Sequence, residues 1–271
     1  ITNPRDLKTF VSIMKKHKFH MISGVNTLYE ALLNYDAFKE LDFSNLLMSL
    51  SGGMAALDTT AKRWAEVTKS VIWQAYGLTE TSPLVSVNDY KQTEFTGSVG
   101  LPAAYTEIEI RDESGIALSE TNAVGELCVR GPQVMSGYWK SEVSGLDENN
   151  WFMTGDIARI DETGNIFIVD RKKDMIIVSG FNVFPNEVEA VVNEHPAVLE
   201  CGCVGVEGEN SQELVKVFIV LHDEQTATED EIISFCREKL TAYKVPKHIE
   251  FIKEIPKTNV GKVLRRELKE N

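Results

Sequence analysis

A run of ten small and polar residues that begins at Gln74 contains side chains that could hold a nucleotide. It reads Gln-Ala-Tyr-Gly-Leu-Thr-Glu-Thr-Ser-Pro and follows an apolar segment typical of a strand. Tyr76 offers an aromatic face for stacking a purine, and Gly77 would let the backbone approach a ligand closely. Thr79 supplies a hydroxyl, and Glu80 supplies a carboxylate of the kind that holds Mg²⁺ together with phosphate oxygens. A polar loop at a strand end, with no ligand, is the alternative interpretation.

Two further motifs carry charged groups. Asp156 ends the run Trp-Phe-Met-Thr-Gly-Asp, and a carboxylate after a Thr-Gly turn can accept two hydrogen bonds from a ribose diol. An Asx turn before the next strand explains the same residues equally well. Arg171 opens the charged run Arg-Lys-Lys-Asp, and its guanidinium could clamp a ribose or a phosphate. The alternative for this run is a solvated linker between two domains.

The last motif is a basic segment near the end of the sequence, Pro-Lys-Thr-Asn-Val-Gly-Lys-Val-Leu-Arg-Arg-Glu-Leu. Lys262 follows Gly261 in a polar loop, so its ammonium could swing into a site. The segment is not a Walker P-loop, because Pro256 stands where the first glycine is required and Val263 replaces Ser or Thr. Five bases and two acids between 257 and 271 give a local charge of +3, so a solvated basic tail is the alternative.

The composition excludes several classes of function. Forty-one acidic residues against 28 basic ones give a net charge of −13, which argues against a general binder of nucleic acid or anionic membranes. No apolar run approaches the roughly 18 residues that a membrane helix requires, and the N-terminus lacks the layout of a signal peptide. These features predict a soluble, cytoplasmic protein. We expect free thiols in the core, not a metal site or a disulfide, because the cysteines lie in apolar contexts without zinc spacing. They are Cys128, Cys201, Cys203 and Cys236.

The elements that must position these motifs begin with an alternation of helix and strand patterns over residues 1–94. Short apolar runs at 46–50 and 71–73 predict strands, and the first ends in the turn residues Ser-Gly-Gly at 51–53. Strand, helix, strand is the pattern of a parallel α/β sheet, whose ligands bind at the carboxyl ends of the strands. Helical spacing of apolar residues is found at 7–14, 28–32 and 60–68.

The pattern changes twice further along the chain. Residues 95–173 contain short alternating segments separated by Gly, Asn and Asp, which predicts a small antiparallel sheet or β-barrel subdomain. Residues 174–271 contain strand and helix patterns typical of a compact α+β unit, including a capping box at Thr228 that starts a helix. We therefore place a domain boundary at Lys173.

Taken together and in this order, the motifs resemble those of the adenylate-forming enzymes. That family includes acyl-CoA synthetases, luciferases and the adenylation domains of peptide synthetases. The matching runs are Tyr-Gly-Leu-Thr-Glu, Thr-Gly-Asp, Asp-Arg-Lys-Lys-Asp, Gly-Phe-Asn-Val and the C-terminal Gly-Lys, and they extend over residues 20–268. Shorter segments at 23–28, 41–44 and 83–88 are most similar to bacterial long-chain fatty acid–CoA ligases.

The resemblance implies a reaction in two halves. A fatty acid and MgATP form acyl-AMP and pyrophosphate; a C-terminal lid then rotates about a hinge at Lys173, and the thiol of coenzyme A attacks. Lys262 would stabilise the developing negative charge of the first half-reaction, with Thr79 and Glu80, the latter at the Mg²⁺. Gly180 would line the pantetheine tunnel. The residues implied to contact ATP or CoA are Gly53, Gln74, Ala75, Tyr76, Gly77, Leu78, Thr79, Asp156, Arg171, Gly180 and Phe181.

One departure from the family pattern is the absence of its Ser/Thr/Gly-rich phosphate loop upstream of these motifs. The similar run Thr-Gly-Ser-Val-Gly at 96–100 falls after them. We therefore expect the sequence to be the C-terminal part of a longer enzyme and to be inactive alone. The alternatives are an adenylation module that loads a carrier protein, an aryl-CoA ligase, or a catalytically silent nucleotide-binding fragment. Peripheral contact with the inner face of the cell membrane is expected because the substrate partitions into lipid; nucleic acid is not an expected partner.

Overall fold

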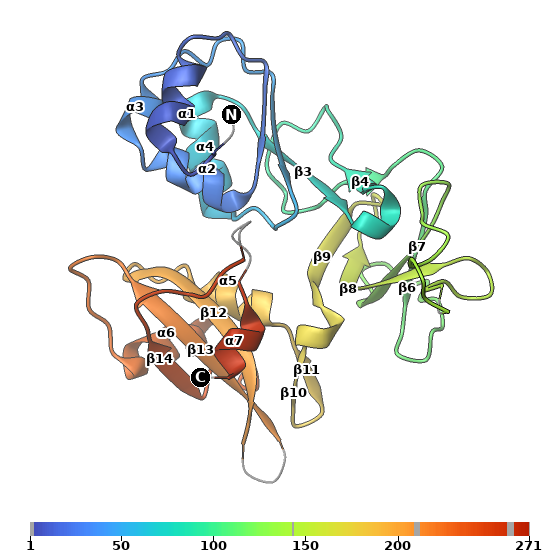
Figure 1. Ribbon diagram of the computed structural model, residues 1–271. Helices are drawn as coiled ribbons and strands as arrows, with labels where there is room; N and C mark the ends of the chain where they lie inside the picture. Colours follow the sequence, from blue (N-terminus) through green and yellow to red (C-terminus); the bar gives the residue numbers. More distant parts are fainter. Residues whose placement is uncertain (1–2, 143, 209–211, 259–262, 271) are drawn as a thin grey trace. The chain divides into compact units, whose positions relative to one another are not determined.

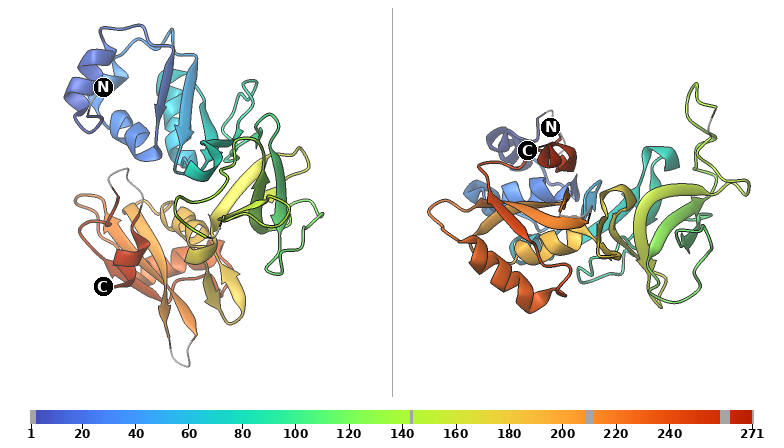
Figure 2. Two further views of the ribbon diagram at one scale, coloured as in Figure 1. Left: turned by 45° about the vertical axis from the view of Figure 1, so that its right-hand side comes forward. Right: turned by 90° about the horizontal axis from the view of Figure 1, so that it is seen from below.

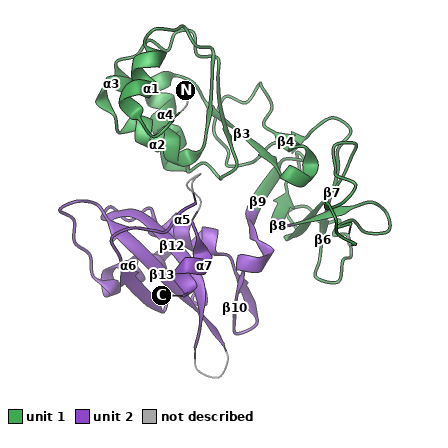
Figure 3. Ribbon diagram, in the orientation of Figure 1, with its two compact units in different colours: residues 1–154, 158–168 green, residues 155–157, 169–271 purple. Residues whose placement is uncertain are grey.

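The computed structural model of the chain (Figure 1) describes residues 3–142, 144–208, 212–258 and 263–270. They divide into two compact units (Figure 3). Unit 1 comprises residues 1–154 and 158–168, and unit 2 comprises residues 155–157 and 169–271. Within the described ranges, no helix combines the length and the apolar character needed to cross a membrane.

Unit 1 begins with a five-stranded sheet in the order β1-β2-β3-β4-β5. The first three strands are parallel, and the last two run antiparallel to their neighbours, so the predicted parallel α/β arrangement is confirmed. The strands are β1 (Met21–Gly24), β2 (Met48–Gly52), β3 (Ile72–Gly77), β4 (Leu84–Val87) and β5 (Leu101–Pro102). The helices are α1 (Leu7–Met14), α2 (Asn26–Leu33), α3 (Asp36–Lys39) and α4 (Asp58–Thr68).

Aromatic side chains join these helices to the parallel strands. Trp64 of α4 lies at the centre of the core, with its ring 4.6 Å from that of Tyr29 and 5.3 Å from that of Phe38. Its indole N–H donates to the hydroxyl of Ser49 on β2 (2.8 Å), and the Tyr29 hydroxyl donates to the carbonyl of Leu50 (2.7 Å). These polar ends are satisfied inside the core, as large buried aromatics require. These contacts therefore attach α2 and α4 to β2.

The second sheet of the chain has the order β6-β7-β8-β9. In the part of the chain that the structure describes, β6 and β9 are its two outer strands and do not pair with each other, so the sheet is open and the predicted barrel does not form. A closed barrel of four strands would be too narrow to hold side chains inside it, because barrel diameter falls with the number of strands. The strands are β6 (Glu107–Arg111), β7 (Gly125–Arg130), β8 (Phe152–Ile160) and β9 (Ile166–Arg171).

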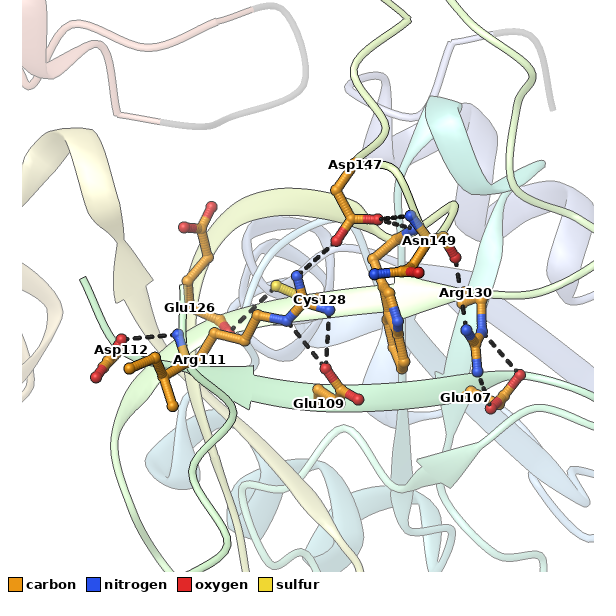
Figure 4. A network of polar contacts seen from close by, with 11 residues as sticks. Glu107, Glu109, Arg111, Asp112, Glu126, Cys128, Arg130, Asp147 and Asn149 are labelled. Carbon is orange, nitrogen blue, oxygen red and sulfur yellow. Dashed lines mark hydrogen bonds and ion pairs between the residues drawn. The ribbon is translucent and has the colours of Figure 1, made fainter. Parts of the chain in front are cut away.

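A network of charged side chains covers β6 and β7 (Figure 4). Arg130 pairs with Glu107 (2.6 Å), and Arg111 pairs with Asp147 (2.8 Å). Both guanidinium groups lie over the ring of Trp151, at 4.6 and 5.1 Å from its centroid, and Asp147 accepts the backbone N–H of Trp151 (2.9 Å). These contacts hold Trp151 in place. Trp151 is the residue just before β8, the strand that carries Asp156.

Unit 2 is built on a three-stranded sheet, β12-β13-β14, in which β12 and β13 are antiparallel and β13 and β14 are parallel. Helices α5 and α6 pack on one face, and α7 lies on the other (Figure 2). A 3₁₀ turn η2 (Lys172–Asp174) and a hairpin of β10 (Ile176–Val178) and β11 (Phe181–Val183) precede the sheet. The remaining elements are α5 (Pro185–Val192), β12 (Val198–Glu207), β13 (Glu213–Leu221), α6 (Glu229–Lys239), β14 (His248–Phe251) and α7 (Arg265–Lys269).

The local features predicted for this unit are confirmed. Thr228 caps α6 reciprocally with Glu231: the backbone N–H of Thr228 donates to Glu231 Oε2 (2.7 Å), and that of Glu231 donates to Thr228 Oγ1 (3.3 Å). Cys201, Cys203 and Cys236 are buried free thiols in the apolar core between the sheet and helices α5 and α6.

Candidate active site

Strand β3 carries the first residues of the predicted nucleotide motif. Gln74 to Gly77 lie on the strand itself, so the prediction that the motif begins after the strand is wrong for these residues. Gln74 is buried, and both ends of its amide are used within unit 1. Its Oε1 accepts the backbone N–H of Ala56 (2.9 Å), and its Nε2 donates to the carbonyl of Ser98 (3.0 Å). Its side chain therefore shapes the end of the sheet by joining two other segments to β3.

Ala75 and Tyr76 follow on the same strand and are both half-buried. Tyr76 packs against the apolar core of the second sheet, in contact with the cluster that includes Val85 and Leu127. Part of its ring surface is thus covered by protein. Stacking on a purine would use the remaining part.

Gly77 is required by the chain's own backbone. A Cβ built at this position would lie 1.8 Å from the carbonyl oxygen of Pro83, so no side chain fits. The same oxygen accepts the backbone N–H of Leu78 (2.9 Å) and the hydroxyl of Thr81 (2.6 Å). The close approach expected of Gly77 is therefore explained by the tight connection between β3 and β4, which fixes the 3₁₀ turn η1 (Thr79–Thr81).

Thr79 and Glu80 lie in η1, where Thr79 is exposed and Glu80 is half-buried. Oε1 of Glu80 accepts a hydrogen bond from the hydroxyl of Tyr138 (3.0 Å), and this bond raises the pKa of Tyr138 because it holds the phenolic proton against a carboxylate. The described residues contain no cluster of three or more acidic, His or Cys side chains that could hold a metal alone. Glu80 fits a Mg²⁺ that takes one carboxylate from the protein and its other ligands from phosphate and water.

Asp156 and Arg171 lie on β8 and β9, and both belong to unit 2. Asp156 is buried, and its Oδ1 lies 2.8 Å from Nε of Arg171, whose side chain is 45% exposed. Asp156 lies inside β8, which passes through Gly155 at a φ of +71°, so the alternative of an Asx turn is wrong. The two side chains predicted to hold the ribose form a pair in which Arg171 reaches solvent.

Gly180 and its neighbour Ser179 form the tip of the β10–β11 hairpin. Both have positive φ, +84° and +50°, as a two-residue type I′ turn requires. The ring of Phe181, the next residue, stacks on that of Tyr243 at 4.7 Å and remains 55% exposed. Lys173 is exposed in η2. Gly53, also exposed, follows β2 with a φ of +81°.

Unit 2 also contains a buried polar cluster whose contacts the sequence motifs do not predict. Asp170 accepts the backbone N–H groups of Arg171 and Asn186, each at 2.7 Å. Nη2 of Arg265 donates to Asn186 Oδ1 (2.8 Å) and lies 2.9 Å from both carboxylate oxygens of Glu189. Burial raises the pKa of Asp170, and it raises that of Glu189 to about 7. Arg265 is 16% exposed, so the interpretation of the C-terminal bases as a solvated tail is wrong for this residue.

The structure thus brings the predicted residues together in two groups. Unit 1 holds Gln74 to Glu80 at one end of the parallel sheet, and unit 2 holds Asp156 beside Arg171. Lys262 lies outside the described residues, so its predicted role is not located here. Asp170 stands within the charged run of the sequence, but Glu189 gives no signal because it lies on an amphipathic helix among valines.

The chain belongs to the AMP-binding enzyme family. The family model described as AMP-binding enzyme matches residues 1–139, and the model described as AMP-binding enzyme C-terminal domain matches residues 187–262. The two matches agree with the resemblance to adenylate-forming enzymes that the motifs predict.

Similarities to individual proteins are more specific than the family. The chain is 51% identical over its whole length to a long-chain-fatty-acid–CoA ligase of Escherichia coli O157:H7, of which it covers 48%. It is similar to the solved structure of ATP-bound MatB from Rhodopseudomonas palustris, with a TM-score of 0.89 and 28% identity over 99% of this chain and 53% of that one. It is also similar to the solved structure of the anthranilate CoA ligase AuaEII in complex with anthranoyl-AMP. The TM-score is 0.87 and the identity is 30%, over 99% of this chain and 52% of that one. The chain therefore spans about half the length of these relatives.

Proposed function

We propose that the whole protein to which this chain belongs activates a long-chain fatty acid with ATP to acyl-AMP and then transfers the acyl group to coenzyme A. The observation that carries this proposal is the 51% identity over the full chain to a long-chain-fatty-acid–CoA ligase. The side chains with which the resemblance associates the chemistry are Glu80, Asp156, Arg171 and Lys262. We further propose that the protein is cytoplasmic and contacts the membrane only peripherally.

In the first half-reaction, the residues of unit 1 would bind and orient ATP. Gln74 to Leu78 would line the adenine and phosphate site, since they end a parallel strand where such ligands bind. Glu80 would hold Mg²⁺, which neutralises phosphate charge when it is bound. Tyr138 supports this role because its hydroxyl orients the Glu80 carboxylate through one oxygen.

The residues of unit 2 would hold the ribose. Asp156 would accept hydrogen bonds from the ribose hydroxyls, and the exposed Arg171 would add donors toward the same sugar. Lys262 would place its ammonium against the negative charge that develops as acyl-AMP forms.

In the second half-reaction, we propose that the C-terminal domain, residues 174–271, rotates about Lys173. The exposed position of Lys173 between β9 and β10 supports a hinge there, because no buried contact of its side chain would have to break. Gly180 lacks a side chain at the hairpin tip, which would leave room for the pantetheine arm of CoA. Rotation of one domain to serve two steps is a known type of enzyme switch.

The test is ATP–pyrophosphate exchange by the whole protein with a panel of acids. The proposal predicts the highest kcat/KM for acids with long alkyl chains, and CoA thioesters as final products. Preference for aromatic acids would instead establish an aryl-CoA ligase, the alternative favoured by the similarity to the anthranilate CoA ligase. Exchange without thioester formation from CoA would indicate a module that loads another acceptor.

A further inference from the structure

The C-terminal segment around α7 is attached to strand β12 by apolar packing. Leu268 is 1% exposed and lies in a cluster with Val204 and Ile255. Gly202 leaves the space for it, since a Cβ at this position would lie 2.6 Å from Leu268 Cδ1. Before the helix, the backbone N–H of Leu264 donates to the carbonyl of Pro256 (2.8 Å). The described residues on both sides of 259–262 are therefore joined to each other.

Arg265 and Glu189 together close the free edge of β12. In the sheet formed by the described residues, β12 pairs with β13 alone, which leaves the outward backbone groups of Cys203 without a strand partner. The N–H of Cys203 donates to Glu189 Oε1 (2.7 Å), and its carbonyl accepts from Arg265 Nε (3.2 Å). The two side chains thus make the hydrogen bonds that a neighbouring strand would otherwise make, and buried backbone groups require such partners.

The same guanidinium reaches the residues that follow β9. Nη2 of Arg265 donates to Asn186, whose backbone N–H donates to Asp170, and Nη1 lies 3.6 Å from Asp174 Oδ2 in η2. Asp170 also accepts the backbone N–H of Arg171. A continuous chain of polar contacts therefore connects the C-terminal segment to β9, whose last residue, Arg171, pairs with Asp156.

An arginine is needed to make this set of contacts. The partners of Arg265 are a backbone carbonyl, an amide oxygen and two carboxylates, and they come from several different elements. A guanidinium presents five donors in a rigid fork, whereas an ammonium presents three from one point. A buried ion pair is often no more stable than apolar side chains of the same volume, and Leu268 already anchors α7 by packing. Placement of the segment, not stability alone, accounts for the arginine.

We propose that Arg265 is a positioning residue of the adenylation step, which fixes the chain that follows Lys262 to the elements that carry Asp156 and Arg171. This inference rests on the proposed function, because it concerns the step assigned to Lys262. Lys262 precedes Arg265 by three residues, and three residues of backbone span at most about 11 Å, so the place of Arg265 limits the region in which Lys262 can act. Misplacement of a catalytic group by 1 Å can reduce a rate by about 10²-fold.

The experiment compares Arg265→Lys and Arg265→Met with Arg266→Met in the whole enzyme at pH 8. Arg266 is the matched control, since it is the next residue and its side chain is 87% exposed. Acyl-AMP formation is followed by pyrophosphate release, and the second step is started from pre-formed acyl-AMP and CoA. We expect both Arg265 variants to lower kcat for acyl-AMP formation at least tenfold, with the KM for ATP and the second step within twofold of the wild type. Arg266→Met should change neither step.

Three results would overturn the inference. Equal losses in both half-reactions would mean that Arg265 supports the fold in general, and unchanged rates in both Arg265 variants would mean that it positions nothing. If Arg265→Met does not fold, the rates of Arg265→Lys alone test the inference. If Arg265→Lys also lacks the circular dichroism spectrum of the folded wild type, Arg265 has a structural role. A wild-type enzyme that forms no acyl-AMP with any acid would refute the proposed function, and this inference with it, which is a distinct outcome.

Discussion

Asp156, the residue proposed to bind the ribose, already has a partner within the protein. It is buried, and its Oδ1 already pairs with Nε of Arg171. An ionised carboxylate has two oxygens and about four acceptor positions, so one such group can accept hydrogen bonds from several partners at once.

This interpretation predicts that Asp156→Asn weakens ATP binding to the whole protein by about tenfold to a hundredfold, since hydrogen bonds to a charged group contribute about 1.5–3 kcal/mol. The matched control is Asp161→Asn. Asp161 lies just after β8 and accepts the backbone N–H groups of Thr163 and Asn165, each at 2.9 Å, as a structural turn residue does. Titration calorimetry should show unchanged ATP affinity for the control. A large loss of thermal stability in Asp156→Asn, at unchanged affinity, would assign the residue a structural role.

Glu189 predicts a pH dependence of stability. Desolvation raises its pKa from the ordinary value of 4.5 to about 7, and the charge of Arg265 and the N–H of Cys203 offset that effect only in part. Between these pH values the unfolded chain loses the proton while the folded protein keeps it. The stability that Glu189 contributes is therefore complete below pH 4.5 and is lost as the pH rises through 7.

Glu189→Gln removes this titration. One pKa unit corresponds to about 1.4 kcal/mol, so the wild type should lose up to about 3 kcal/mol relative to the variant between pH 4.5 and 7. All four tryptophans lie in unit 1, at positions 64, 73, 139 and 151, so fluorescence would not report on this site. Native-state hydrogen exchange of the amides in β12 and β13 measures it directly. Parallel pH profiles for the two proteins would contradict the shift.

At the scale of the elements, the connection between β3 and β4 fixes the conformation of the candidate nucleotide loop. The carbonyl of Pro83 accepts two hydrogen bonds and leaves no space for a Cβ at Gly77. We therefore predict that Gly77→Ala destabilises unit 1 by about 1–3 kcal/mol or more, the usual range for overpacking. Gly52→Ala is the matched control, because its Cβ would meet the carbonyl of Ala75 at 3.4 Å, an acceptable contact. Urea unfolding followed by tryptophan fluorescence compares the two, and equal midpoints would refute the prediction.

The sequence predicts those elements whose information is local. Apolar spacing and the capping box at Thr228 indicate α1, α4 and α6, because the contacts that define a helix lie within four residues. The extent of β3 and β8 is not local: polar residues and glycine indicate turns, yet ladder partners on neighbouring strands keep Gln74 and Thr154 extended. The second sheet is open because its outer strands, β6 and β9, do not pair with each other. The alternation of residues in the sequence does not show whether two strands pair.

The candidate site shows the same division. Glu80, Asp156 and Arg171 stand in motifs that can be read along the chain. Arg265 stands among exposed bases, and its burial depends on Glu189, which lies 76 residues earlier. Judged by their charge alone, both residues would be expected at the surface. Their burial follows from hydrogen bonds to the free edge of β12, which the sequence does not reveal. The polar cluster therefore emerges only from the folded structure.

At the scale of the whole molecule, the two compact units carry different parts of the proposed chemistry. The residues proposed to bind adenine, phosphate and Mg²⁺ lie in unit 1, whereas the ribose pair, the hairpin tip at Gly180 and the polar cluster of Arg265 lie in unit 2. The proposed hinge at Lys173 belongs to unit 2, close to where β9 passes from one unit to the other.

The last prediction separates the two half-reactions by a single side chain. Lys262→Ala in the whole protein should lower the rate of acyl-AMP formation by about 10²-fold or more, the effect of losing one preorganised contact to developing charge. If the C-terminal domain turns Lys262 away for the second step, pre-formed acyl-AMP and CoA should yield thioester at a rate close to that of the wild type. Lys269→Ala is the control, since Lys269 is an exposed base in the same segment and should leave both steps unchanged. Loss of both steps in a folded Lys262→Ala enzyme would disprove the assigned role, and loss of neither would make Lys262 an ordinary surface base.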